Sequence, residues 1–323
     1  MKAKLTLYQA KQNLHKWIGN RVGLALGGGG ARGLAHIGVL KVLDEEQIPI
    51  GVIAGTSMGA LIGAAYASGL TAVELEKKAA EYLNTPEFQS SVIRAMERAN
   101  EEADVSFTKR IQNFLINKFY LVQAMFKPGI LSTGEFQSMI DYFVPDIEIE
   151  ETQIPWHAVA ADLVSGEEIV FSKGSLRRAV LASCAVPGAI EPIKDGERLL
   201  SDGGIVSMVP TRVARQQGAD TVIAVVVEKK LSFHEKLQTG KDITLRATEV
   251  MSHRLVYHDL LAADIVIHPE VADLEWSDFS QALDLIEAGV KATRENLPQI
   301  RRAISGINRW FPAKKILRNI LQR

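Results

Sequence analysis

Cysteine is almost absent from this sequence, which contains only Cys184 among its 323 residues. A single cysteine cannot form an intramolecular disulfide, which suits a reducing compartment, and its small apolar neighbours indicate a buried core residue rather than a nucleophile. The sequence also lacks cysteine pairs, an H-E-x-x-H helix and acidic calcium-binding loops. We therefore expect no metal ion and no other cofactor.

Long apolar runs are absent as well, since no stretch approaches the roughly 18 apolar residues that a membrane span requires. The first 21 residues are broken by lysines and predict no secretory signal peptide. The net charge is only −1, so no global field would recruit nucleic acid. These features predict a cytoplasmic globular protein without nucleic-acid partners, and 323 residues suffice for one large α/β domain or two smaller ones.

Residues 55–59 read Gly-Thr-Ser-Met-Gly and match G-x-S-x-G, the pattern of a nucleophile elbow. Residues 48–54 before it are apolar and β-branched, which predicts a buried parallel strand. Residues 60–67 after it are apolar on every side, which predicts a buried helix. Gly55 and Gly59 would leave room for the sharp turn that exposes the serine hydroxyl. The pattern is common by chance, but this setting favours Ser57 as a nucleophile.

A glycine loop, residues 27–33, follows a second predicted strand at 22–26 and precedes a predicted helix at 34–43. A dinucleotide site would need an acidic residue at the end of the next strand, and a phosphate loop would need Gly-Lys-Ser/Thr; the sequence has neither. The third interpretation is an oxyanion hole, in which consecutive glycine N–H groups approach a tetrahedral intermediate. The nearby serine elbow favours this third interpretation.

Asp202, followed by two glycines, is the third candidate. Asp-Gly is common turn chemistry, so an ordinary turn is one interpretation. The other is a functional carboxylate at the edge of the core, because an apolar run leads into Asp202 and another follows it. Both interpretations stay open on these residues alone.

Taken together, the G-G-G-x-R-G loop at 28–33, the G-x-S-x-G elbow at 55–59 and the D-G-G at 202–204 resemble the bacterial branch of the patatin-like phospholipase family. Residues 182–188 also look like the family segment that precedes the aspartate. The similarity covers about residues 22–267. We expect a three-layer α/β/α sandwich with a mixed, mainly parallel central sheet.

The resemblance implies a serine acyl-ester hydrolase that acts on lipids through a Ser–Asp dyad, with Ser57 as nucleophile and Asp202 as base. The backbone amides of the loop would form the oxyanion hole, Arg32 and Gly33 would support that loop, and Gly55 and Gly59 would shape the elbow. The expected oxyanion donors are Gly28, Gly29 and Gly30. Plant members have an acid just before the loop, where this chain has Gly27.

The expected domain organisation has three parts. Residues 1–20 form a basic N-terminal segment, and 21–304 form the catalytic domain. Residues 305–323 form a basic amphipathic tail with no acidic residue. The tail is either a peripheral contact with an anionic membrane, at its inner face, or a docked terminal helix. No sequence signal indicates an oligomeric state.

Within the catalytic domain, the sequence predicts a helical insertion at about 86–127, which is either a lid or an ordinary helical pair. It also predicts a hairpin between 156–161 and 168–171, and a helix over 281–304 that is interrupted near Pro298.

Other functions compete with lipid hydrolysis. His268 ends a late predicted strand, where a Ser–Asp–His triad would place its base, although the serine follows only the second strand. An acyltransferase would use the same acyl-enzyme and pass the acyl group to an alcohol or thiol. A non-catalytic lipid-binding or regulatory protein would not need an intact Ser57, Asp202 and glycine loop. His36 lies in an apolar helix and is interpreted as a packing residue.

Overall fold

The computed structural model describes residues 21–91, 94, 129–131, 133–231, 237–271 and 278–305. The predictions for the N-terminal segment 1–20, for most of the insertion 86–127 and for the tail after residue 305 lie outside these residues. In the described part of the chain, no helix combines the length and apolar character needed to cross a bilayer.

The fold is built around an eight-stranded mixed sheet. Its strands are β1 (Val22–Leu26), β2 (Val52–Thr56), β4 (Trp156–Asp162), β5 (Glu168–Phe171), β7 (Ile193–Asp195), β8 (Arg198–Asp202), β9 (Thr221–Val225) and β10 (Ile265–Ile267). The order is β10-β9-β1-β2-β4-β8-β7, and β5 also pairs with β4. The strands from β10 to β4 are parallel, whereas β5, β8 and β7 join in antiparallel fashion. The predicted hairpin is β4–β5. A separate parallel pair consists of β3 (Gly129–Leu131) and β6 (Gly188–Ile190).

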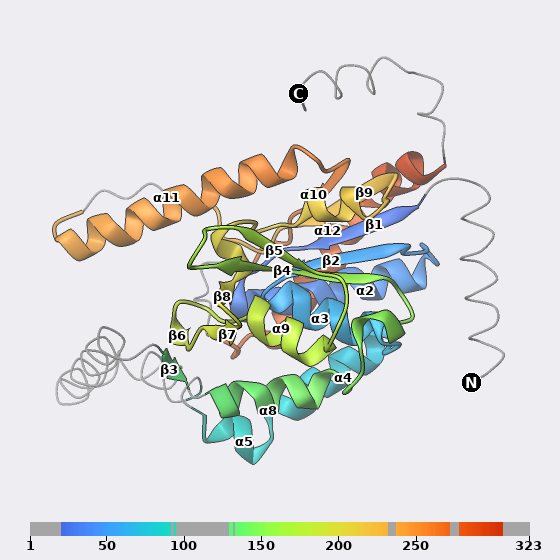
Figure 1. Cartoon of the computed structure of the whole chain (residues 1–323). Helices are drawn as coiled ribbons and strands as arrows, with labels where there is room; N and C mark the ends of the chain where they lie inside the picture. Colours follow the sequence, from blue (N-terminus) through green and yellow to red (C-terminus); the bar gives the residue numbers. More distant parts are fainter. Residues whose placement is uncertain are drawn as a thin grey trace, which may run out of the picture.

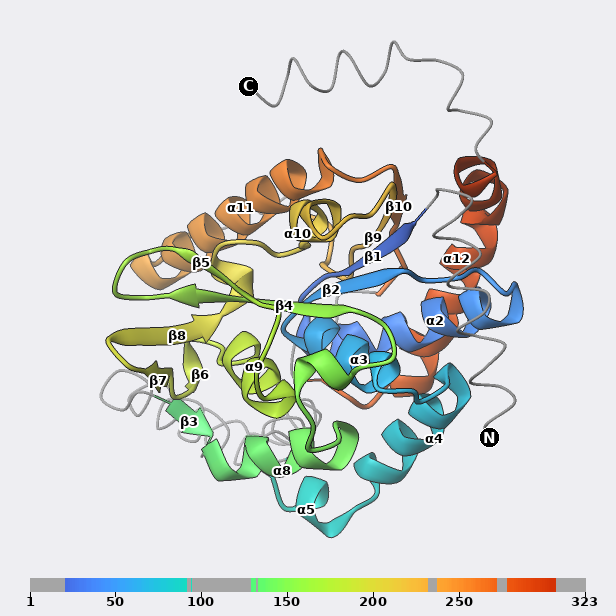
Figure 2. The ribbon, with the colours of Figure 1, turned by 45° about the vertical axis from the view of Figure 1, so that its right-hand side comes forward.

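Helices cover both faces of the sheet (Figures 1 and 2). One face carries α2 (Ala35–Glu45), α3 (Met58–Ala67), α9 (Leu176–Ser183) and α12 (Ala282–Ile304), and the other carries α10 (Thr211–Gln216) and α11 (Gly240–Leu260). Outside α3 lie α4 (Ala72–Leu83), α5 (Pro86–Gln89) and α8 (Thr133–Phe143). Short 3₁₀ turns occupy η1 (Gly30–Leu34), η3 (Ile149–Glu151) and η4 (Gly203–Ile205). The expected three-layer sandwich with a mixed, mainly parallel sheet is confirmed.

Two apolar cores follow from the alternation of side chains along the central strands. Leu24, Leu26 and Ile53 are buried in the larger core with α2 and α3. Ala25 and Val52 point to the opposite face, where they meet buried residues of α10 and α11. Because both faces are covered, β1 and β2 consist almost entirely of apolar residues, the pattern that predicted them.

The predicted interruption of the last helix at Pro298 is wrong, because α12 runs through Pro298 to Ile304. A proline removes one backbone hydrogen bond and crowds the preceding turn, but contacts beyond it can hold the helix. Ile300 is fully buried in the larger core, and Arg301 forms an ion pair with Glu46 of α2. Pro298 itself is exposed. Tertiary packing therefore outweighs the local preference.

Candidate active site

Ser57 lies on the turn between β2 and α3 in a backbone conformation that non-glycine residues rarely adopt. Its φ is 52° and its ψ is −126°. Such strain persists only where surrounding contacts enforce it, and it is concentrated at functional sites. The Ser57 N–H donates to the Ser183 hydroxyl at 3.0 Å. The turn therefore has the geometry of a nucleophile elbow.

The flanking glycines permit this turn by close packing. A Cβ on Gly59 would lie 2.3 Å from the Leu26 carbonyl oxygen, and one on Gly55 would lie 2.5 Å from the Ala60 Cα. Both neighbours are backbone atoms and cannot move aside. The elbow thus presses directly against the end of β1, where the glycine loop begins.

Strand register brings Asp202 to the level of Ser57. β4 lies between β2 and β8, and in it Val159 pairs with Thr56 while Ala160 pairs with Asp202. The two residues are therefore held across one intervening strand. After Asp202 the chain crosses β4 so closely that a Cβ on Gly203 would lie 2.2 Å from the Val159 carbonyl oxygen.

The Asp202 carboxyl group is buried, with 7% of the residue exposed. Its Oδ1 accepts the Gly204 N–H at 2.7 Å, whereas Oδ2 has no hydrogen-bond partner in the described part of the chain. Burial raises the pKa of Asp202 to about 6, and the nearby Ser57 hydroxyl and the Gly204 N–H oppose that increase. Asp202 thus combines a free acceptor oxygen, a neighbouring serine and a pKa close to neutrality, which are properties of a general base.

In the glycine loop, the three expected oxyanion donors differ. The Gly28 N–H already donates to the Met208 carbonyl oxygen at 2.9 Å. Within the described residues no partner is found for the amides of Gly29 and Gly30. The expectation for the loop therefore narrows to Gly29 and Gly30 as donors, with Gly28 as the residue that holds the loop beside Ser57.

Other contacts hold the loop from behind. The Arg32 Nε donates to the Gly29 carbonyl at 3.1 Å, as expected of a supporting residue. A Cβ on Gly33 would lie 2.4 Å from the Met58 Cγ, so this glycine allows the loop to approach α3. The buried His36 ring bonds through Nε2 to the Gly27 carbonyl at 2.8 Å, and burial lowers the pKa of His36 to about 4. His36 is thus a neutral packing residue.

Valine at Gly29 or Gly30 is expected to lower turnover by about 10²–10³-fold, the usual cost of one lost oxyanion donor. A Cβ on Gly29 would lie 2.7 Å from Val227 Cγ2, and Gly30 has a φ of 59°, which β-branched residues avoid. Ester hydrolysis by Gly29→Val and Gly30→Val would measure the loss.

Gly196→Val is the matched control for backbone strain. Gly196 has a φ of 62°, and its Cβ would meet nothing within 4 Å in the turn between β7 and β8. We expect Gly196→Val to lose stability but keep turnover. Near-normal turnover in both loop variants would make the glycine loop purely structural.

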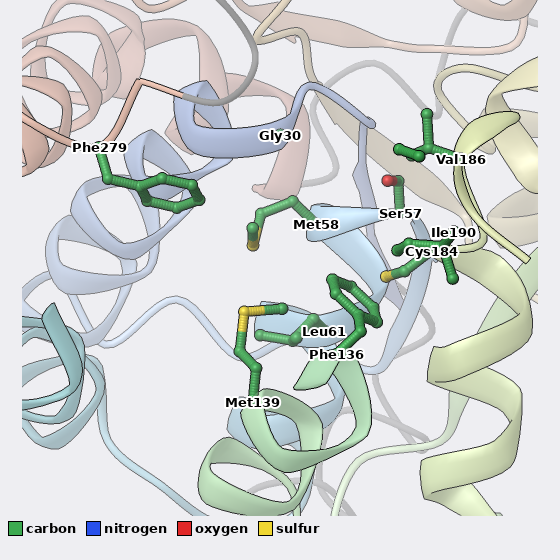
Figure 3. A pocket seen from close by; sticks show the side chains of 11 residues that line it. Gly30, Ser57, Met58, Leu61, Phe136, Met139, Cys184, Val186, Ile190 and Phe279 are labelled. Carbon is green, nitrogen blue, oxygen red and sulfur yellow. The ribbon is translucent and has the colours of Figure 1, made fainter. Parts of the chain in front are cut away.

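An apolar cleft opens beside Ser57. Figure 3 shows Ser57 next to Cys184 and Val186, with Phe136 and Met139 of α8 on the other side of the space. The cleft encloses about 490 Å³, including its open mouth. Met58, Leu61, Met139 and Phe279 also line a second apolar space of about 480 Å³, which continues toward Tyr82 and Phe88. The two spaces together form a path away from Ser57 lined by hydrocarbon and aromatic groups.

Three residues near the site escaped the sequence interpretation of function. Ser183 holds the Ser57 N–H, and the Met208 carbonyl holds the glycine loop. Cys184 is buried as expected, but it lines the cleft and contacts the Ser57 hydroxyl. Burial and then the Asp202 carboxylate raise the pKa of the Cys184 thiol, which keeps it neutral and unreactive. Only the three-dimensional contacts identify these roles.

The histidines do not assemble a triad in the part of the chain that is described. His157 bonds Ser172, His253 bonds the Lys229 carbonyl, and His268 bonds the Glu228 carbonyl. None of the described histidines forms a hydrogen bond with Ser57 or Asp202. Among the same residues there is no group of three or more His, Cys, Asp or Glu side chains that could hold a metal ion.

Comparisons with known proteins agree with this arrangement. The mouse protein named "Patatin-like phospholipase domain-containing protein 6" is 38% identical over 213 residues, which is 65% of this chain and 14% of that protein. An uncharacterized NTE family protein of Mycobacterium bovis is 36% identical over 207 residues, covering 64% of this chain and 48% of that protein. The chain thus matches less than half the length of either relative.

Among solved structures, VipD from Legionella pneumophila aligns with a TM-score of 0.44 and 15% identity, covering 87% of this chain and 67% of VipD. The sequence profile described as "Patatin-like phospholipase" matches residues 24–215, more than half of the chain, and this range contains the glycine loop, the serine elbow and Asp202. The protein therefore belongs to the patatin-like phospholipase family.

Proposed function

We propose that this protein is a serine acyl-ester hydrolase acting on lipids, with Ser57 as nucleophile, Asp202 as base and the glycine loop as oxyanion hole. One observation carries the proposal: the strained Ser57 lies beside a buried carboxylate whose Oδ2 lacks a partner. A buried unpaired oxygen costs free energy, so its presence next to a serine hydroxyl supports a functional role.

The chemistry would proceed in two acyl-transfer steps. The Ser57 Oγ attacks the ester carbonyl while its proton passes to Asp202 Oδ2, and the amides of Gly29 and Gly30 hydrogen bond the oxyanion. When the C–O bond breaks, the alcohol leaves with the proton from Asp202. Water then attacks the acyl-enzyme, again giving its proton to Asp202, and this releases the fatty acid and restores Ser57.

The cleft supports a lipid substrate. Its lining beside Ser57 is almost wholly apolar, which suits an acyl chain better than a polar ester such as a sugar acetate. The printed name of the mouse relative, a phospholipase domain-containing protein, points to the same class of substrate. A phospholipid, a lysophospholipid or another long-chain acyl ester is therefore the proposed substrate.

Hydrolysis of p-nitrophenyl acyl esters by purified protein, together with fluorophosphonate labelling mapped by peptide mass spectrometry, tests this function. We expect label on Ser57 and release of free fatty acid from a lysophospholipid panel. An acyltransferase would instead yield new ester when an alcohol acceptor is added, and a non-catalytic lipid-binding protein would give neither label nor product. Label on a different serine would overturn the assignment.

Met139→Trp is expected to shift activity toward short acyl chains, since Met139 lines both apolar spaces where they meet. Each buried methylene is worth about 0.8 kcal/mol, so excluding two of them lowers kcat/KM by roughly tenfold. The measurement compares p-nitrophenyl palmitate with p-nitrophenyl butyrate. Met139→Leu is the volume-matched control and should keep the wild-type ratio. An unchanged ratio in Met139→Trp would place the acyl chain elsewhere.

Peripheral contact with an anionic membrane through the basic tail is a further proposal from the sequence. Each basic residue near an anionic surface is worth about 1 kcal/mol. Deleting residues 306–323 should therefore reduce co-sedimentation with phosphatidylglycerol vesicles, and high salt should reduce binding of the full chain in the same way. Equal binding by both chains at low salt would favour a docked terminal helix.

A further inference from the structure

A three-residue segment, 207–209, contacts all three motifs of the candidate active site. The Ser207 carbonyl accepts the Thr56 hydroxyl at 2.9 Å, directly before the elbow serine. The Met208 carbonyl accepts the Gly28 N–H at 2.9 Å, which holds the glycine loop. The Ser207 N–H donates to the Gly203 carbonyl at 2.8 Å, in the turn that follows Asp202.

The Met208 side chain adds contacts to two of these motifs. Its Sδ lies 3.0 Å from the Cβ position of Gly28, and its Cε lies 3.1 Å from that of Gly204. The glycine loop and the Asp202 turn are therefore packed against the same side chain. Any displacement of residues 207–209 would move the oxyanion donors, the elbow and the base together.

One buried carboxylate fixes this segment. Asp259 of α11 is 2% exposed. Its Oδ2 accepts the Val209 N–H at 2.9 Å and its Oδ1 accepts the Ser207 hydroxyl at 3.3 Å. The Met208 N–H also hydrogen bonds this carboxylate. The Thr211 hydroxyl donates to the Asp259 backbone carbonyl, so α10 is joined to the same residue.

We propose that Asp259 is a positioning residue of the active site, whose carboxylate fixes residues 207–209 and through them the elbow, the glycine loop and the Asp202 turn. The proposal rests on the proposed function of Ser57. A buried charge is costly, and an apolar pair of similar shape would pack with less penalty. Burial indeed raises the pKa of Asp259 to about 6. What a carboxylate supplies here, and an apolar residue cannot, is simultaneous acceptance from three successive residues.

Asp259→Asn tests the proposal, because an amide has one acceptor oxygen and turns an NH₂ donor toward other donors. We expect kcat to fall by about 10²-fold, with KM for a p-nitrophenyl ester within a few-fold of wild type, since displaced catalytic groups cost this much. The rate at which a fluorophosphonate labels Ser57 should fall in parallel. All rates are expressed per site that eventually labels, so that unfolded protein does not contribute.

Asp264→Asn is the matched control. The Asp264 Oδ2 likewise accepts a backbone N–H, that of Val222 at 2.8 Å, and the carboxylate pairs with Arg215 away from the catalytic loops. We expect Asp264→Asn to lower the melting temperature while kcat stays near wild type. A carboxylate with only a structural role would give this same pattern at Asp259.

Thr56→Val and Thr56→Ser test the same segment from its other end, even if Asp259→Asn does not fold. Thr56→Val removes the hydroxyl that donates to Ser207 and should lower kcat by about tenfold. Thr56→Ser keeps the hydroxyl and should restore most of that loss. In the double variant with Asp259→Asn, the effects should combine to less than their product, since both act through residues 207–209.

Wild-type labelling at Ser57 together with an unaltered kcat in folded Asp259→Asn overturns only this inference. Equal kcat in Thr56→Val and Thr56→Ser overturns it as well. Failure of the wild-type protein to label at Ser57 overturns the proposed function and this inference with it.

Discussion

Ser57→Ala is expected to abolish ester hydrolysis and fluorophosphonate labelling, with a loss of turnover on the order of 10⁴–10⁶-fold. The Ser57 Oγ is the hydroxyl that the strained turn presents to the cleft, beside the free oxygen of Asp202. Without it no acyl-enzyme can form. Steady-state hydrolysis and labelled-peptide mapping measure the two effects.

Stability measurements separate this loss from misfolding. Ser68→Ala makes the same chemical change at the other end of α3, where the hydroxyl bonds only the Ala64 carbonyl, and should keep full activity. Ser57→Gly should melt at a higher temperature than Ser57→Ala, since glycine relieves a backbone strain of about 1–3 kcal/mol. Labelling that survives Ser57→Ala in folded protein would defeat the assignment.

The sequence predicted the elements that carry strong local signals. The strand 22–26 matches β1 residue for residue, because five apolar residues followed by glycines leave few alternatives. The elbow serine has the positive φ that its two small neighbours allow. The strand predicted at 48–54 is shifted, since β2 spans Val52–Thr56. Pro49 lacks the N–H that a central strand needs, which delays the start of pairing.

Long-range contacts account for what the sequence did not predict. The Gly28 amide is engaged by Met208, which lies 180 residues further along the chain, and no local pattern announces that bond. Asp259 reads as one more acid on an amphiphilic helix until α11 is packed against residues 207–209. Conversely, Pro298 gave a clear local signal that packing overruled. Motifs reveal which residues can react, whereas tertiary structure decides which residues hold them in place.

Asp202→Asn is expected to be nearly as damaging as Ser57→Ala, because a dyad has no other group to accept the serine proton. General-base assistance is worth about 10²–10⁴-fold in rate, and residues that act as one unit fail together. The pH dependence of the wild-type protein should agree. Since the pKa of Asp202 is about 6, kcat/KM should fall as pH drops below 6 and the carboxylate becomes protonated.

Two other assignments of that acidic limb can be tested. Asp259 also has a pKa raised to about 6, so the limb should persist in the residual activity of Asp259→Asn if Asp202 causes it. Single alanine substitutions at His157, His253, His258 and His268 should each leave most of the activity. A histidine variant that reproduces the Ser57→Ala defect in folded protein would indicate a triad instead.

Stability gives Asp202→Asn a second readout with a definite sign. Burial raises the folded-state pKa of Asp202 from 3.8 to about 6, so ionisation of Asp202 costs stability as pH rises through that range. At pH 7 to 8, removing the charge should therefore stabilise the fold, by up to about 3 kcal/mol. Asp162→Asn should do the reverse and keep activity. Hydrogen bonds from the Ser165 hydroxyl and from backbone amides lower the pKa of Asp162, so its charge stabilises the fold above that pKa.

An inactive Asp202→Asn variant that melts at or above the wild-type temperature would separate the lost chemistry from any loss of structure. Such a pairing of lost activity with gained stability is typical of buried catalytic groups, which are retained for function at a cost to the fold. If Asp202→Asn hydrolyses esters within a few-fold of wild type, the dyad is wrong and the serine proton leaves by another route. If it is inactive but strongly destabilised, the Asp202 carboxylate holds the turn at Gly204 and the base must be sought elsewhere.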